Sequence, residues 1–231
     1  LDQVRVRLSG VTDPDLLAQA WQQVVDRTPV LRSAVAWEGL SRPVQVVQRR
    51  VTVPVLHSDL RSRTGAERDA ELDRLSAEDR ATGIDLTRAP LLRLAIVRLT
   101  DDEVLLQWSS HHIALDGWST AAVFAEVGEQ YAALTAGRAP QPATRRPFRD
   151  YLAWLAGQDA AEAQRYWRGV LAGVEAPTPL PYDRSPADAH RTESSRSLRL
   201  ELSPQESAQL HGTARAYGLT VNTVVDRKSV V

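Results

Sequence analysis

The chain of 231 residues carries 28 basic and 29 acidic side chains, without long runs of either sign and without the basic stripe typical of nucleic-acid binding. It contains no apolar stretch of membrane-spanning length, no signal peptide and no cysteine, which excludes a disulfide framework. Its length suits one large domain or one and a half smaller ones, and 43% hydrophobic residues can fill the core. The absence of cysteine is compatible with the cytoplasm without requiring it, and we expect a cytoplasmic protein that binds neither nucleic acid nor membrane.

The first part of the chain alternates strand and helix signals. Apolar and polar residues alternate over Val4–Leu8, which predicts a strand, and Asp13 or Asp15 is expected to open a helix reaching about Asp26. The elements expected next are a strand pair at Ala34–Trp37 and Val44–Arg49, joined through Gly39, and a strongly charged helix from Thr64 to about Thr82.

A second strand pair is predicted at Leu91–Leu99 and Val104–Ser110, around the turn-forming cluster at 100–102. Apolar residues at helical spacing then predict a helix over Trp118–Gly137. Further along we expect a loop at 138–147, a mostly helical segment at 147–172, a Pro- and Asp-rich connector at 177–190, a strand at Ser197–Leu202 and a helix capped by Ser203 and Pro204.

This order predicts an α/β protein, an α+β sandwich in which helices cover a sheet. We expect a first lobe at residues 1–175, a connector at 176–190 and the incomplete start of a second lobe at 191–225. Because the chain begins at Leu1 and contains no methionine, we expect it to be a segment of a longer protein. The last six residues, 226–231, break the apolar pattern and resemble the translation of a sequencing adaptor, so we expect a non-native tail.

Two adjacent histidines mark the strand-to-helix turn after Ser110. His111 and His112 are followed by Asp116 and Gly117, which gives the pattern His-His-x-x-x-Asp-Gly. A turn between a buried strand and a helix can hold a side chain rigidly while leaving it accessible. Since imidazole is the side chain best suited to move protons near neutral pH, the pattern favours a catalytic site.

Other interpretations of this pattern remain open. The histidines could be ordinary core or turn residues, or they could form a pH switch, for which nothing else in the sequence argues. A metal site with Asp116 is disfavoured because adjacent residues on a strand point to opposite faces. The chain also has only five histidines, with no cysteine and no second ligand cluster, so we expect no metal.

Three further segments accompany the histidine motif in a characteristic order: Trp21–Val35, Gly83–Arg93 and Phe148–Trp154. With these four motifs, the chain up to about Val225 resembles the condensation domain of non-ribosomal peptide synthetases, within the chloramphenicol acetyltransferase superfamily. The resemblance implies a two-lobed fold with a tunnel between the lobes, of which only the first lobe is complete here. Thr28 stands where the family usually has histidine, a minor departure from the pattern.

The resemblance implies an acyltransferase-type enzyme domain that forms amide bonds. Upstream and downstream peptidyl carrier proteins would deliver acyl and aminoacyl thioesters on phosphopantetheine arms, with an adenylation domain in the same megasynthase and no cofactor bound covalently. The alternatives are a coenzyme A-dependent acyltransferase of the same superfamily and a catalytically silent carrier-protein docking module. We expect the 231-residue fragment alone to be inactive, because its second lobe is incomplete.

The resemblance also implies roles for individual residues. His112 would act as general base or as hydrogen-bond anchor for the attacking amine, and the backbone N–H of Gly117 would face the developing oxyanion. His111 would support the fold through a hydrogen bond. Asp116 would form a buried pair with Arg32, or as second choice with Arg27, and removal of one partner would cost about 3–5 kcal/mol.

Overall fold

The structure, a computed structural model, describes residues 1–139, 146–176 and 200–227. These residues group into two units, Leu1–Asp159 and Ala160–Val231. The lobe boundary expected at residue 175 concerns a complete two-lobed domain, and it stays a prediction.

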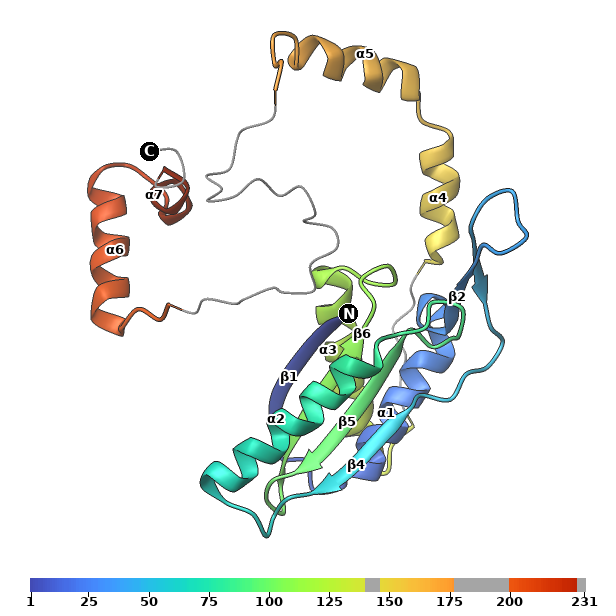
Figure 1. Cartoon of the computed structure of the whole chain (residues 1–231), viewed down its shortest axis with the longest axis vertical. Coiled ribbons are helices and arrows are strands. Elements are labelled where there is room, and N and C mark those ends of the chain that lie inside the picture. Colours follow the sequence, from blue (N-terminus) through green and yellow to red (C-terminus); the bar gives the residue numbers. More distant parts are fainter. Residues whose placement is uncertain (140–145, 177–199, 228–231) are drawn as a thin grey trace. The chain divides into compact units, whose positions relative to one another are not determined.

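A four-stranded sheet in the order β1-β6-β5-β4 organises the first unit (Figure 1). β6 (Glu103–Ser110) pairs antiparallel with β1 (Asp2–Ser9) on one side and with β5 (Leu92–Arg98) on the other. β4 (Val55–Asp59) pairs with β5 in parallel. The central strands β5 and β6 read as nearly continuous apolar runs because both of their faces are covered.

Helices α1 (Pro14–Arg27) and α3 (Gly117–Thr135) pack on one face of the sheet (Figure 1). Asp13 caps α1 by accepting hydrogen bonds from the backbone N–H groups of Asp15 and Leu16, which decides between the two predicted helix starts. This face holds the main apolar core. At its centre Trp21, Trp108 and Phe124 contact one another at ring-centroid distances of 4.9–5.3 Å.

Helix α2 (Gly65–Thr82) covers the opposite face of the sheet. Its apolar contact is small: Leu72 is its one buried residue among those described, and it packs with Val97, Leu99 and Leu105. Toward the end of β6 the residues facing α2 are polar, namely Gln107 and Ser109. The two faces of the sheet are therefore held by different kinds of interaction.

The first unit contains three further elements: a 3-10 turn, a two-stranded hairpin and the helix α4. A 3-10 turn at Pro29–Arg32 leads into a two-stranded hairpin of β2 (Ser33–Ala36) and β3 (Val44–Val47). After α3 comes α4 (Phe148–Ala156), all of whose residues are exposed.

The second unit contains α5 (Ala160–Val170), α6 (Pro204–Ala216) and α7 (Val221–Arg227). Ser203 caps α6, as the sequence predicted, and the structure adds a reciprocal arrangement with Glu206. Helices α6 and α7 contact each other.

Most predicted elements are confirmed, with three differences. The strand β4 was not predicted, and the helical segment at 147–172 is divided into α4 and α5 at Gly157. The described part of the predicted strand at Ser197–Leu202, residues 200–202, is not a strand, since no described segment pairs with it. Three predicted segments lie wholly or mostly outside the described residues: the start of that strand at 197–199, the connector at 177–190 and most of the loop at 138–147.

Candidate active site

The predicted catalytic turn begins directly where β6 ends. Ser110 is paired with Asp2 of β1 and with Leu92 of β5, so three strands end together at this point. The backbone N–H of His111 donates to the carbonyl of Leu91 at 3.1 Å, and the N–H of Ala114 donates to the carbonyl of His111 at 3.0 Å. Backbone hydrogen bonds therefore fix the turn on the sheet before any side chain contributes.

His111 makes a hydrogen bond within the turn. Its Nδ1 accepts from the backbone N–H of Ile113 at 3.2 Å. A nitrogen that accepts carries no proton, so in this arrangement the neutral imidazole has its hydrogen on Nε2. This contact agrees with the expected supporting role of His111, which stays a prediction.

His112 presents its imidazole to solvent, with 69% of the side chain exposed. Its Nδ1 lies 2.8 Å from Oδ2 of Asp2, at the beginning of β1. Asp2 was not predicted as a site residue, because the pairing of β1 with β6 joins residues about a hundred positions apart. An alternating strand pattern identifies β1 but says nothing of its partner or register.

Asp116 caps the helix that follows the turn. Its Oδ1 accepts from the backbone N–H of Ser119 at 2.8 Å. Hydrogen bonds from the backbone and hydroxyl of Ser119, and the nearby His112, hold the pKa of the Asp116 carboxyl below its ordinary value. The position is exposed, unlike the buried pair that was expected.

Gly117 is the first residue of α3. Among the described residues its backbone N–H has no hydrogen-bond acceptor, as is usual in the first turn of a helix. Apart from its chain neighbours and the nearby backbone of its own helix, nothing in the described chain lies within 4 Å of the place where a Cβ would stand. Gly117 is itself an exposed residue.

The predicted pairing of Asp116 with Arg32 or Arg27 is not formed, and this prediction is corrected. Arg32 donates to the backbone carbonyls of Gln48 and Arg49, which ties the 3-10 turn to the end of the β2–β3 hairpin. Arg27 forms an ion pair with Glu126 at 2.9 Å. Glu126 lies ten residues beyond Asp116 on α3, about 15 Å along the helix axis, so Arg27 cannot serve both carboxylates.

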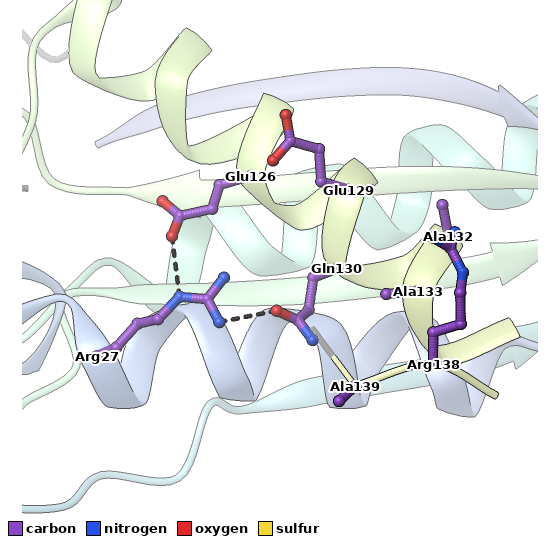
Figure 2. A pocket seen from close by; sticks show the side chains of 8 residues that line it. All are labelled: Arg27, Glu126, Glu129, Gln130, Ala132, Ala133, Arg138 and Ala139. Atoms are coloured by element: carbon purple, nitrogen blue, oxygen red, sulfur yellow. Dashed lines mark hydrogen bonds and ion pairs between the residues drawn. The ribbon is translucent and has the colours of Figure 1, made fainter. Parts of the chain in front are cut away.

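Figure 2 shows the polar cluster that binds the Arg27 side chain, where α1 packs against α3. Arg27 donates from Nε to Glu126 and from Nη1 to Gln130 at 2.7 Å, and Gln130 in turn donates to Gln23 at 2.6 Å. Glu126 and Gln130 are buried. The cluster borders a cavity of about 600 Å³ whose lining residues do not include the histidine turn.

A smaller cavity of about 200 Å³ opens beside the histidine turn itself. Ile113 and Ala114 form its wall on the turn, and the hairpin supplies Val35 and Val44. Within residues 1–139, 146–176 and 200–227, no three His, Asp or Glu side chains gather as metal ligands, and no helix has the length and apolar character needed to cross a membrane.

Comparison with known proteins gives one consistent family. The sequence model described as "Condensation domain" matches residues 1–226. One of the linear gramicidin synthase proteins of Brevibacillus parabrevis is 40% identical over 223 residues, which are 96% of this chain and 4% of that protein. The chain thus spans a small part of the curated relatives that it matches.

Solved structures agree with the sequence comparison. The first condensation domain of the calcium-dependent antibiotic synthetase, solved with a substrate analogue, has a TM-score of 0.73 and 25% identity, over 96% of this chain and 52% of that one. VibH, a condensation enzyme, has a TM-score of 0.66 and 24% identity, over 96% of this chain and 51% of that one. The predicted α/β fold, like that of condensation domains, is confirmed.

Proposed function

Since the chain belongs to the condensation-domain family, we propose that it supplies the first lobe of a site at which a non-ribosomal peptide synthetase forms amide bonds. The observation that carries the proposal is the exposed imidazole of His112, held beside Asp2 and five residues before the open N–H of Gly117. The matched relatives are synthases of peptide products such as linear gramicidin, bacitracin and surfactin.

The reaction requires one bond to form and one to break. The amine of the downstream aminoacyl thioester attacks the carbonyl carbon of the upstream acyl thioester, so that a C–N bond forms and a C–S bond breaks. The proton lost by the amine ends on the departing thiol. His112 either takes this proton as general base or holds the amine by a hydrogen bond, and both roles need an unprotonated ring nitrogen directed at substrate.

The neighbours of His112 suit this chemistry. The Asp2 carboxylate at Nδ1 favours the tautomer with its proton there, which leaves Nε2 to accept from the amine. The N–H of Gly117, at the positive end of α3, supplies a donor for the tetrahedral oxyanion. Holding two tethered reactants together contributes further, because orientation replaces a bimolecular encounter.

The substrates and partners form part of the same proposal. Upstream and downstream peptidyl carrier proteins bring the thioesters on phosphopantetheine arms, and an adenylation domain of the same megasynthase loads them. The reaction takes place in the cytoplasm, where ATP is available for amino-acid activation. The chain itself binds no cofactor covalently.

A histidine substitution in the longer synthetase segment, with two loaded carriers, tests the proposal. His112→Ala is expected to lower the rate of amide formation by about a hundredfold or more. His57→Ala is the matched control, since His57 is also exposed and its Nδ1 lies 3.7 Å from Asp15 at a place far from the turn in sequence. Unchanged amide formation in His112→Ala, with a native circular dichroism spectrum, would overturn the proposal.

The same assay separates the alternative functions. Acylation of a free amine from acyl-coenzyme A, without carriers, would assign the domain to the coenzyme A-dependent acyltransferases of the superfamily. Binding of carriers without any product would assign it to docking modules. The inactivity of the 231-residue chain alone stays a prediction, and turnover of both carrier-bound substrates by that chain would contradict it.

A further inference from the structure

One carboxylate of α2 binds side chains from three neighbouring strands. Gln3 of β1, Ser109 of β6 and Arg93 of β5 form a row across the sheet, because Ser109 is paired with both of the others. Asp79 accepts hydrogen bonds from all three: from Gln3 at 2.5 Å, from the Ser109 hydroxyl and from the Arg93 guanidinium. A single side chain thus joins the three strands to one helix.

Additional hydrogen bonds tie the same row to the end of α2. Arg93 also donates to the backbone carbonyls of Asp79 and Gly83, and Gln3 donates to the carbonyl of Ser76 at 3.0 Å. The Asp79 and Arg93 side chains are largely buried, with 17% and 21% of their surfaces exposed. Burial raises the pKa of Asp79, but the hydrogen bonds from Arg93, Ser109 and Gln3 outweigh this and hold it below its ordinary value.

This row lies directly behind the histidine turn. Ser109 is three residues before His112, and Gln3 is adjacent to Asp2, which contacts His112. On the third strand, Arg93 is two residues after Leu91, whose carbonyl accepts from the N–H of His111. Each of the three strands that meet at the turn therefore carries a side chain that binds Asp79.

We propose that Asp79 is a positioning residue for His112, acting through Ser109, Gln3 and Arg93 to fix the strand ends that carry the turn. In its effect on amide formation this inference rests on the proposed function. Its effect on the turn itself can be measured without any substrate.

The competing explanation is that Asp79 merely docks α2 on the sheet. Asp73 offers a matched comparison, since it lies on the same helix and binds Arg5 of β1 at 3.0 Å. Arg5 is paired with Gln107, two positions farther from the turn than the Ser109 row. Asp73→Asn therefore removes a carboxylate contact between α2 and β1 while the row behind the turn stays intact.

Amide hydrogen exchange in the 231-residue chain measures the turn directly. We expect Asp79→Asn to speed exchange at His111 and Ile113 by at least about tenfold, with little change in the core of α1, because the opening is local. Ser109→Ala is expected to act in the same direction while retaining the ion pair of Asp79 with Arg93. It decides the question if Asp79→Asn fails to fold. Asp73→Asn should leave the turn amides unchanged.

Amide formation in the longer synthetase segment gives the second measurement. We expect Asp79→Asn to lower kcat by about tenfold to a hundredfold at temperatures where it is folded, with KM for the loaded carriers unchanged. Asp79→Glu should restore part of the rate, and Asp73→Asn should match the wild type.

Two results would overturn the inference. One is that Asp79→Asn accelerates exchange uniformly over the whole first unit. The other is that Ser109→Ala shows wild-type exchange at the turn while Asp79→Asn keeps the wild-type kcat. If His112→Ala kept its activity, the proposed function would fail. The exchange result would then still decide whether Asp79 fixes the turn.

Discussion

The two faces of the sheet are stabilised in different ways. On the α1 and α3 face, apolar side chains from β5 and β6 interdigitate with helix residues around Trp21 and Trp108. On the α2 face, a small apolar cluster around Leu72 gives way to the hydrogen bonds of Asp79 as β6 approaches the histidine turn. Apolar burial is strong but has little directional preference, whereas a hydrogen-bonded carboxylate fixes its partners in one geometry.

The difference shows how stability and positioning are divided across one sheet. Because the apolar cluster on the first face is the larger of the two, we expect burial there to contribute more to stability than burial on the second face. Directional bonds on the second face fix the strand ends at the place where the site residues emerge. Each face should therefore respond to a different perturbation.

The largest effect on stability is expected from the apolar face. Trp108→Ala should lower the free energy of unfolding by about 3–5 kcal/mol, because Trp108 is 1% exposed and its removal leaves a cavity against Trp21 and Phe124. Urea denaturation measures this. Trp118→Ala is the control, since Trp118 is 88% exposed and should change stability by less than about 0.5 kcal/mol. Similar losses for both variants would mean that burial of Trp108 is not what stabilises the α1 and α3 face.

The α2 face should be the acid-sensitive one. Because the pKa of Asp79 is lowered in the folded state, its contribution is complete above the unfolded pKa of about 3.9 and is lost as pH falls through the lower folded value. Asp79→Asn should cost about 1–3 kcal/mol at pH 7. Its difference from the wild type should shrink steadily below about pH 4, as urea denaturation at a series of pH values would show. A difference independent of pH would mean that the carboxylate charge is not what stabilises this face.

Double-mutant cycles test the corrected arginine assignments. Arg27→Ala and Glu126→Gln should be non-additive, with a coupling of about 0.5–3 kcal/mol, because the two side chains meet at 2.9 Å. Asp116→Ala and Arg32→Ala should be additive, because they have separate partners. Coupling in the second cycle would restore the pair that the sequence predicted.

The smallest effect is expected at the helix cap. Asp116→Ala should lower the melting temperature slightly, because the N–H of Ser119 loses its acceptor, whereas Asp116→Asn retains an acceptor and should stay near the wild type at pH 7. Since the pKa of Asp116 is lowered, its contribution is present above the unfolded pKa and lost as pH falls through the folded value. Calorimetry of the two variants at pH 7 and pH 3 measures both effects.

The sequence predicts the fold well where the pattern is local. Alternation gives β1, helical spacing gives α1 and α3, and the Asp101–Asp102 turn gives the β5–β6 hairpin. The strand β4 was missed because it is short, follows Pro54 and lies at the edge of the sheet, where its exposed residues carry no alternating signal.

For the candidate site, the sequence gives which predicted residues share the turn but not what they contact. His111, His112, Asp116 and Gly117 lie together on one turn because they are close in sequence. The partners Asp2, Asp79 and Glu126 come from other elements, and a sequence pattern does not give the register that brings them together. Asp116 as a helix cap could have been recognised, since an Asp before Gly-Trp-Ser at a helix start is a capping signal.

The pairing of β1 with β6 also sets the order in which the protein can fold during synthesis. β1 leaves the ribosome about 100 residues before its partner, a delay of roughly 5–20 s at usual elongation rates. The β5–β6 hairpin can close at once, while β1 must wait and then close a long loop. Asp2 and His112 therefore meet only in a late, non-local step, and a nascent chain that stops before Glu103 leaves β1 as an unpaired strand open to misassembly.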